Sequence, residues 1–146
     1  MIVAVASDHA GFELKNKIKE HLEKIGLTVE DFGTFKSESV DYPDYGVLAA
    51  RAVSQQRVDV AIVVCGSGIG MSIVANKVKG VRAALCLTQE MAELSRRHND
   101  ANVLALPGRL IDHDEALKIV DVWLKTSFDG GRHLRRISKI HQLTGM

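Results

Sequence analysis

The residues best suited to chemistry form one short stretch, Cys65-Gly66-Ser67-Gly68-Ile69-Gly70. A thiol and a hydroxyl alternate there with glycines, whose backbone N–H groups can turn into one concavity and bind an anion. A thiol beside a helix N-terminus is favoured as the thiolate, so Cys65 can act as a nucleophile or as a proton acceptor. We therefore predict a functional loop here, in preference to a structural turn with a buried, inert cysteine.

Several common anion-binding motifs do not fit this loop. A dinucleotide fingerprint that starts at Gly66 needs a glycine where Met71 stands, and a P-loop needs a Gly-Lys-Ser/Thr triplet. A cysteine phosphatase loop would need an arginine at the same position. Without that arginine, attack of the thiol on phosphorus lacks its electrostatic partner. A covalent nucleophile of the hydrolase or transferase class is thus an alternative that the loop disfavours.

Two polar pairs lie where predicted elements end. Asp8 and His9 follow the first apolar run, where the aspartate could also simply cap the next helix. His98 and Asn99 lie at the expected end of a helix. A histidine there often just interacts with the helix dipole, and an asparagine there often takes the left-handed C-cap conformation. Each pair is therefore a candidate for the site, with a structural alternative.

Three arginines are candidates for binding a phosphate. Arg132 and Arg136 are four residues apart on one face of a predicted helix, and Arg109 follows the apolar run 102–106. Paired guanidinium groups offer charge-assisted hydrogen bonds to phosphate oxygens. A basic run of this kind is also typical of a solvated surface.

The elements that must position these residues alternate between apolar strands and amphipathic helices. We predict strands at 2–6, 27–32, 58–64, 81–87 and 102–106, and helices at 12–25, 45–53, 71–77, 89–97, 115–125 and 132–142. In the last helix Leu134, Ile137 and Ile140 form the apolar face, and Cys86 in the fourth strand is expected to be a buried small hydrophobe.

This alternation indicates a parallel sheet with right-handed crossovers. We predict a three-layer, Rossmann-like α/β fold whose five strands follow the order 2-1-3-4-5, with a C-terminal helical extension. In that order the first and third strands are neighbours whose crossovers leave on opposite faces. Their carboxyl ends then open a crevice between Ser7-Asp8-His9 and Cys65-Gly66-Ser67.

The bulk properties exclude several classes of protein. With 146 residues, 46% of them hydrophobic, the chain suits a single domain over 1–146, in which 130–146 is a basic helical tail. A net charge of +1 with mixed signs argues against a nucleic-acid or membrane partner. The first apolar run is too short for a signal peptide, and none approaches the ~18 to 20 residues of a membrane span. Two cysteines without metal or disulfide spacing indicate reduced thiols and a cytoplasmic protein.

Six motifs follow one another along essentially the whole chain: Ser7-Asp8-His9-Ala10-Gly11, Asp41-Tyr42-Pro43, Cys65-Gly66-Ser67-Gly68-Ile69-Gly70, Ala75-Asn76-Lys77, Arg97-His98-Asn99-Asp100-Ala101-Asn102 and Gly130-Gly131-Arg132-His133-x-x-Arg136. Together they resemble the ribose-5-phosphate isomerase B family, which also holds the galactose-6-phosphate isomerase subunits. The resemblance implies a metal-free aldose–ketose isomerisation of a phosphosugar through a cis-enediolate, without a cofactor.

The resemblance also implies a substrate. Ribose 5-phosphate and ribulose 5-phosphate, the pair of the pentose phosphate pathway, are the commonest in the family. Hexose phosphates such as allose 6-phosphate or galactose 6-phosphate fit the same chemistry and stay an alternative. A third interpretation of the same residues is a regulator that binds a sugar phosphate without catalysis.

The family's roles carry over by position. Cys65 resembles the base that takes the C2 proton and returns it to C1, while Ser67 and the backbone N–H groups of Gly66, Gly68 and Gly70 resemble the donors that stabilise the enediolate oxygen. The other positions resemble the family's ring-opening acid/base and its assistant (His98 and Asp8), its sugar-hydroxyl contacts (Tyr42 and Asn99) and its phosphate-binding residues (His9, Arg109, Arg132 and Arg136).

The family site is built from two subunits. We therefore expect a homodimer, or a dimer of dimers, in which His98, Asn99 and Arg109 face Cys65 of the partner chain. Two positions differ from other members of the family. Met71 stands where members without the cysteine have a catalytic glutamate, so the role of base falls to Cys65. Ser67 replaces the threonine of many members and keeps its hydroxyl.

Overall fold

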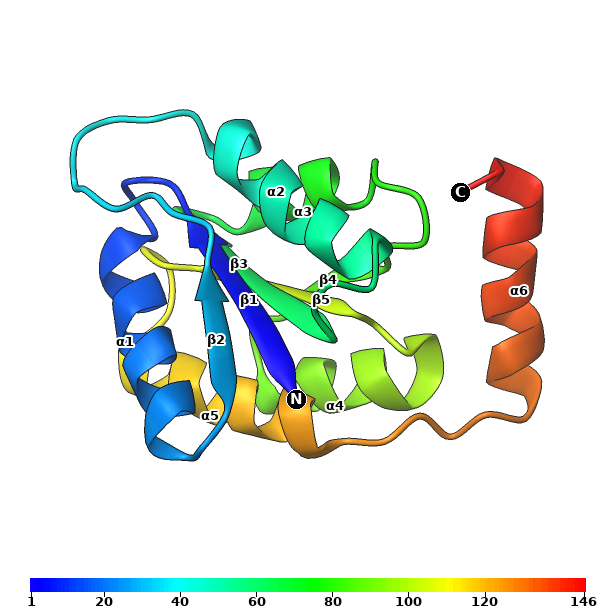
Figure 1. Cartoon of the computed structure of the whole chain (residues 1–146). Coiled ribbons are helices and arrows are strands. Elements are labelled where there is room, and N and C mark those ends of the chain that lie inside the picture. Colours follow the sequence, from blue (N-terminus) through cyan, green and yellow to red (C-terminus); the bar gives the residue numbers. More distant parts are fainter.

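Five parallel strands form the middle layer of the fold, and helices cover both of its faces (Figure 1). The computed structural model describes all of residues 1–146. In chain order the elements are β1 (Ile2–Ser7), α1 (Phe12–Lys24), β2 (Thr28–Asp31), α2 (Tyr42–Ser54), β3 (Val60–Cys65), α3 (Ile69–Ala75), β4 (Ala83–Leu85), α4 (Gln89–Asn99), β5 (Val103–Pro107), α5 (His113–Lys125) and α6 (Arg132–Thr144). The Rossmann-like α/β class predicted from the alternation of strands and helices is confirmed.

The order of the strands is β2-β1-β3-β5-β4, so the predicted order 2-1-3-4-5 is wrong for the last two strands. All residues of β5 are buried, whereas β4 is half-buried along its length and pairs with β5 alone. A strand inside a parallel sheet must be apolar on both faces. Arg82, directly before β4, needs polar surroundings, and its guanidinium donates to the carbonyl oxygens of Asn99 and Asp100 at the edge.

The two faces of the sheet pack against different helices. Val3 and Val5 of β1 belong to the apolar cluster with α1, α4 and α5, while Ala4 and Ala6 belong to the cluster with α2 and α3. The helices that follow β1 and β3 therefore lie on opposite faces, as predicted. The crevice between the carboxyl ends of these two neighbouring strands follows from this arrangement.

Some boundaries of elements differ from the predicted ones. Helix α2 begins at Tyr42 rather than Tyr45, because Pro43 lies in its first turn, where the missing N–H of proline costs no hydrogen bond. Strand β4 is shorter than the predicted 81–87, and Cys86 lies just beyond it. Cys86 is buried, as expected, and burial raises the pKa of its thiol.

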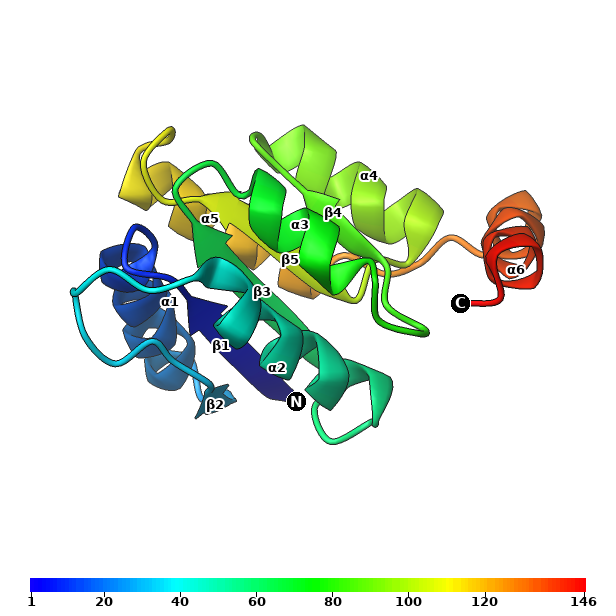
Figure 2. The same cartoon turned by 90° about the horizontal axis from the view of Figure 1, so that it is seen from above.

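Helix α6 stands apart from the three layers (Figures 1 and 2). Only His133 and Ile137 of this helix are buried, whereas Leu134 and Ile140 are 56% and 46% exposed. The predicted apolar face of α6 is therefore only partly covered within one chain. We call α6 with its linker, residues 126–144, the arm.

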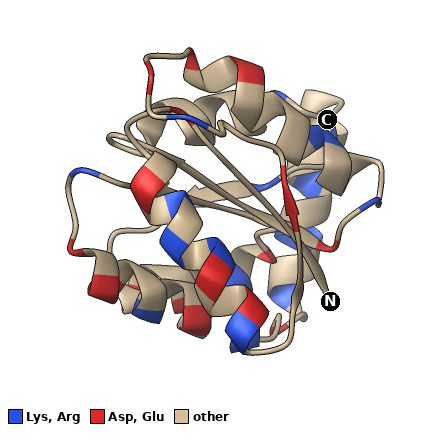
Figure 3. Ribbon diagram, turned by 60° about the vertical axis from the view of Figure 1, so that its left-hand side comes forward, with Lys and Arg blue, Asp and Glu red and all other residues tan.

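Charges of both signs are interspersed over α1, α2, α4 and α5, whereas α6 carries basic residues only (Figure 3). On α1, for example, Lys17 pairs with Glu13 and Lys24 with Glu20, each one turn apart. Such exposed pairs stabilise a helix only slightly and produce no field of a single sign. None of the helices combines the length and the apolar character that crossing a membrane requires.

Candidate active site

Two of the predicted residues lie side by side at the carboxyl ends of β1 and β3. Ser7 is paired with Val64, and the Asp8 N–H donates to the Val64 carbonyl at 3.3 Å, so Asp8 comes directly beside Cys65. Adjacent strands are about 4.8 Å apart. Both side chains are nearly buried, with Cys65 4% and Asp8 6% exposed. A carboxylate and a thiol thus share one sheltered edge of the sheet.

Asp8 also has the structural role that its position suggested. Its Oδ1 accepts a hydrogen bond of 3.0 Å from the Gly11 N–H, in the turn before α1. Gly11 is required there, because a side-chain carbon would lie 2.5 Å from the Val64 carbonyl oxygen. The turn after β1 is therefore pressed against the end of β3, which fixes Asp8 relative to Cys65.

The loop after Cys65 turns sharply into α3. Gly68 has φ of 75°, and a side chain on it would meet the backbone of Leu106 and the side chain of Leu85. The Ser67 hydroxyl accepts a hydrogen bond of 3.2 Å from the Ile69 N–H, which leaves its own proton free to donate to a bound oxygen. We call residues 66–70 the glycine nest.

Gly70 has a packing role that the sequence did not indicate. It lies within α3, and a side-chain carbon there would be 2.6 Å from Cζ of Tyr42. The missing side chain makes room for the Tyr42 ring, which is 38% exposed. Tyr42 is therefore beside the glycine nest, as its predicted contact with the substrate requires.

The same edge receives His9 and Arg109. The Val40 N–H donates to Nδ1 of His9 at 3.2 Å, so the segment before α2 orients this ring. The Arg109 N–H donates to the Gly66 carbonyl at 3.1 Å, and Cδ of Arg109 would lie 3.7 Å from a side-chain carbon on Gly66. Arg109 therefore lies on the Cys65 side of its own chain, and the expectation that it faces the partner's Cys65 is wrong.

The remaining candidates lie at the opposite edge of the sheet. Helix α4 runs back along the sheet and ends at Asn99, and the Asn102 carbonyl accepts from Ala61 near the start of β3. The strand rises about 13 Å from Ala61 to Cys65, at about 3.3 Å per residue. One chain therefore does not bring His98 or Asn99 to Cys65. Asp100, with φ of 44°, takes the left-handed position at the end of α4, so Asn99 is not the C-cap.

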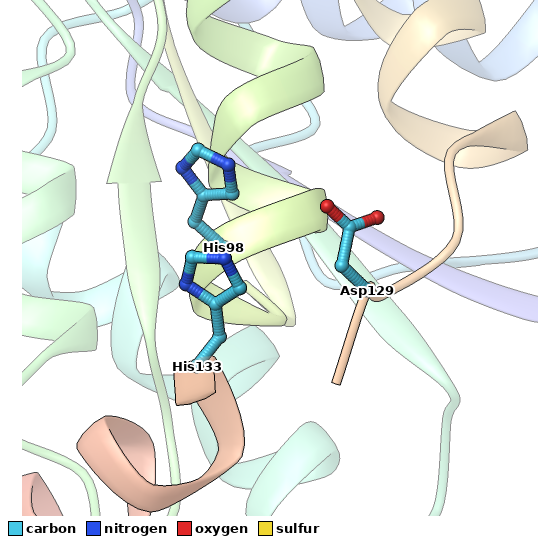
Figure 4. Close-up of side chains that lie close together, drawn as sticks. All are labelled: His98, Asp129 and His133. Carbon is cyan, nitrogen blue, oxygen red and sulfur yellow. The ribbon is translucent and has the colours of Figure 1, made fainter. Parts of the chain in front are cut away.

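His98 instead meets the arm (Figure 4). Its ring stacks on that of His133, with centroids 4.3 Å apart and an interplanar angle of 10°. Asp129 lies beside the pair and is held by the Arg97 guanidinium at 3.2 Å. Arg132 and Arg136 follow on the same helix, so the predicted phosphate-binding pair is attached to the His98 end of the chain.

His133 was not predicted to have a role, although it stands within the Gly130-Gly131-Arg132-His133 motif. The sequence did contain one indication that His133 is buried: it lies one helical turn before Ile137, and these two residues form the docked face of α6. Burial lowers the pKa of His133, and the nearby cations of His98, Arg132 and Arg136 lower it further.

His98, Asp129 and His133 are ligand-type residues whose donor atoms lie within 4.8 Å of one another. A metal ion bound to imidazole nitrogen lies at about 2.0–2.1 Å and in the plane of the ring. Two nearly parallel, stacked rings cannot both meet that condition. Arg97 also occupies the carboxylate of Asp129. The geometry of this cluster therefore does not suit a metal ion.

A cavity of about 360 Å³ lies between the arm and the body of the protein. It is lined by Arg82, Asn99 and His141, among others. The Arg82 guanidinium is 3.0 Å from Nε2 of His141, which ties the second half of α6 to the sheet edge. This cavity lies at the His98 end of the molecule and does not include Cys65.

Comparisons with known proteins agree with the resemblance in sequence. The family model described as Ribose/Galactose Isomerase matches residues 3–140. Ribose-5-phosphate isomerase B of Escherichia coli is 46% identical over 138 residues, which cover 94% of this chain and 93% of that protein. The putative sugar phosphate isomerase YwlF of Bacillus subtilis is 48% identical over 141 residues, covering 96% and 95% of the two chains.

Solved structures extend the likeness to three dimensions. Ribose-5-phosphate isomerase B of Clostridium thermocellum superposes with a TM-score of 0.98 and 52% identity, covering 99% of this chain and 98% of that one. The Mycoplasma genitalium ribose-5-phosphate isomerase B, whose structure has bound ribulose-5-phosphate, gives a TM-score of 0.96 with 44% identity, covering 99% and 96%. The chain belongs to the ribose/galactose isomerase family.

Proposed function

We propose that this protein interconverts ribose 5-phosphate and ribulose 5-phosphate through a cis-enediolate, with Cys65 as the general base and without a metal ion. The observation that carries the proposal is that Asp8 follows Ser7, the partner of Val64, and so lies beside Cys65 and the Ser67 loop at the crevice between β1 and β3. Its support from outside the chain is family membership and the named activity of the relatives.

The reaction assigns one task to each part of this edge. The Cys65 thiolate removes the C2 proton of the open-chain aldose, and the electrons of that bond form the C1–C2 double bond as the carbonyl electrons move to the C1 oxygen. The thiol then returns the proton to C1 while the proton of the C2 hydroxyl passes to the C1 oxygen, which leaves the carbonyl at C2. The oxyanion formed in between is stabilised by Ser67 and by the N–H groups of the glycine nest. A base with a pKa near neutrality suits this shuttle better than a fully ionised carboxylate.

Phosphate binding would fix the sugar at a distance from the reacting carbons. Arg132 and Arg136 present two guanidinium groups from one face of α6, while the His9 ring and the Arg109 guanidinium belong to the Cys65 side. These contacts would hold C1 and C2 within reach of one sulfur atom. His98 would open the sugar ring, Asp8 would assist, and Tyr42 and Asn99 would contact its hydroxyls.

We further propose that the site is shared between two copies of the chain. His98, Asn99 and the two arginines of the arm would then face the partner's Cys65, so that residues 130–146 complete the partner's site. The exposure of Leu134, Ile140 and Leu143 on the arm supports a second copy as their cover, since Leu143 is 85% exposed. A homodimer, or a dimer of such dimers, acting in the cytoplasm is the assembly proposed.

The experiment that tests the activity is a panel of pentose and hexose phosphates in deuterated water, followed by NMR. Ribose 5-phosphate should exchange C1 or C2 hydrogen and yield ribulose 5-phosphate, whereas a larger rate with an allose or galactose phosphate would move the proposal to hexoses. No exchange with any sugar phosphate would refute the isomerase. A phospho-cysteine trapped on Cys65 would refute the shuttle mechanism in favour of covalent catalysis.

Mutant kinetics separate the two ends of the site. Cys65→Ala should lower kcat by roughly 10²–10⁴-fold, the usual range for a lost general base or acid. Arg132→Ala and Arg136→Ala should mainly raise KM, by about 10-fold or more for each lost charge-assisted contact. The reverse pattern would contradict this division of roles.

Mixing two inactive variants tests the shared site. Cys65→Ala and His98→Asn subunits, unfolded together and refolded, should form heterodimers in which one of the two sites is intact. Random pairing then restores about a quarter of the wild-type sites. If the mixture stays as inactive as its components, each chain acts alone.

A further inference from the structure

The stack of His98 on His133 is the main contact by which the arm meets the end of α4. His133 is 9% exposed on a helix whose other buried residue is Ile137, while His98 is half-buried at the last turn of α4. The two rings are nearly parallel, with centroids 4.3 Å apart (Figure 4). His98 therefore has one face covered by a side chain from another element.

A second contact fixes the arm just before the stack. The Asp129 N–H donates to the Arg97 carbonyl at 3.0 Å, and the Arg97 Nε donates to the Asp129 carboxylate at 3.2 Å. Arg97 is the neighbour of His98 in sequence. The linker is thus tied to the same turn of α4 that carries His98, and the first turn of α6 has little freedom to slide.

The stack restrains rotation of the His98 imidazole about its side-chain bonds, and the orientation of this ring matters for the proposed ring-opening step. An imidazole at an exposed helix end can turn about its side-chain bonds and take several rotamers. A ring packed flat against His98 leaves only those rotamers that keep the two planes parallel. Catalytic groups need this restraint, because a misplacement of about 1 Å can cost about 100-fold in rate.

We propose that His133 is a positioning residue for His98, which it holds by stacking in the one ring orientation that presents its nitrogen to the sugar ring in the partner's site. The inference rests on the proposed function and adds a residue to it. His133 touches neither the reacting carbons nor the sulfur, so it acts through His98.

The charged groups around the stacked pair disfavour protonation of His133. The groups that face it are Arg97 and Asp129 beside α4, and Arg132 and Arg136 on α6. Burial lowers the pKa of His133, and the cationic neighbours lower it further. The fold therefore favours a neutral His133, which serves as an uncharged stacking surface for His98.

Two variants of His133 separate stacking from other roles. His133→Phe keeps a flat ring against His98, whereas His133→Ala removes it; both should be checked for an unchanged circular dichroism spectrum and thermal midpoint. We expect His133→Ala to lower kcat with ribose 5-phosphate by about 10-fold, with KM within about twofold. His133→Phe should restore most of that kcat.

Other outcomes would overturn the proposal. A raised KM with unchanged kcat in both variants would make His133 a phosphate contact, and equal losses of kcat in Phe and Ala variants would remove stacking as the cause. The ring protons of His98, observed by NMR, provide a readout independent of turnover: the upfield ring-current shift should be lost in His133→Ala and kept in His133→Phe. If the wild type turns over no sugar phosphate but the His98 ring protons show this difference between the two variants, the proposed function is refuted while the stacking contact is confirmed. If the His98 ring protons shift equally in His133→Ala and His133→Phe, the positioning role is refuted.

Discussion

The buried ion pair between Lys15 and Asp31 offers the sharpest test of how the site is supported. Lys15 is 1% exposed, and its Nζ lies 2.7 Å from both carboxylate oxygens of Asp31. The rings of Phe12 and Phe35 lie 5.6 and 5.2 Å from the same nitrogen. Asp31 ends β2 and begins the segment that leads through Val40 to the active edge, so the pair anchors this segment.

The magnitude follows from two opposing effects. At 2.7 Å and an effective dielectric constant of about 20 the attraction is about 6 kcal/mol. Desolvation costs several kcal/mol for each ion, so the intact pair contributes little net stability. Burial lowers the pKa of Lys15 while Asp31 raises it, with burial the larger cause. Removing only the carboxylate charge leaves that desolvated ammonium uncompensated, which costs about 3–5 kcal/mol.

The variant is Asp31→Asn, which keeps an oxygen for the 2.9 Å hydrogen bond from the Gly33 N–H. At about 2–4 °C per kcal/mol for a chain of this size, its thermal midpoint should fall by roughly 6–20 °C. The matched control is Lys19→Met, because Lys19 is 39% exposed and its Nζ is 3.7 Å from the same carboxylate. Because the Lys19 ammonium is solvated and its contact is longer, Lys19→Met should cost less than about 1 kcal/mol.

Guanidinium chloride and thermal unfolding of both variants decide the matter. The double variant Lys15→Met/Asp31→Asn, which keeps the acceptor for the Gly33 N–H, should recover most of the stability lost in Asp31→Asn, since neither buried charge is left. If Asp31→Asn costs no more than Lys19→Met, or if the double variant is less stable than the single one, the reasoning about desolvation is refuted.

Three further predictions concern packing, pH and thiol access. Gly11→Ala should destabilise the fold by about 1–3 kcal/mol in denaturant melts and lower kcat, because its side-chain carbon would meet the end of β3 at 2.5 Å; Gly66→Ala, whose nearest contact is 3.6 Å, should unfold within about 0.5 kcal/mol of wild type. Because the pKa of His133 is lowered in the fold from its ordinary 6.5, the unfolded chain binds that proton more tightly. Stability should therefore decrease as pH falls through and below 6.5, and urea midpoints of His133→Phe should fall less steeply over the same range. In a Cys65→Ala background, a thiol reagent should label Cys86 only as fast as the chain unfolds, since that side chain is 1% exposed; rapid labelling of the native chain would contradict its burial.

The sequence was sufficient to predict the strands that build the crevice, because their apolar runs are unbroken. Val60 to Cys65 is buried at every residue, and such a run has few alternatives to a central strand. The position of β4 in the sheet was not predictable from periodicity. It depends on whether β4 or β5 is the strand that can lie at the edge, and periodicity does not distinguish them. Arg82 favours the edge position for β4 because its guanidinium donates to the carbonyl oxygens of Asn99 and Asp100. Those partners are known only from the fold.

The candidate site was also predictable only in part. Asp8 and Cys65 end neighbouring strands, so topology alone brings them together. Arg109 was predicted on the wrong side because its loop returns to Gly66, a contact that no local pattern records. The stack of His98 on His133 was not predicted for a similar reason: it joins two segments through a linker whose course is fixed by the pairing of Asp129 with Arg97.

The separation of Cys65 from His98 within one chain is a property of the fold and not of a flexible segment. Parallel strands and the helices that return along them run in opposite directions, so the end of a strand and the end of a helix lie at opposite edges of the sheet. The arm does not shorten this distance, because its linker is bonded to α4 at Arg97 and its first turn is stacked on His98 itself. No rearrangement short of unfolding α4 would therefore bring the two residues together in one copy. The proposed reaction uses a thiolate at one edge and an imidazole with paired arginines at the other, and this separation is the reason for proposing that two chains supply them. In that proposal the exposed apolar residues of the arm contact the second copy.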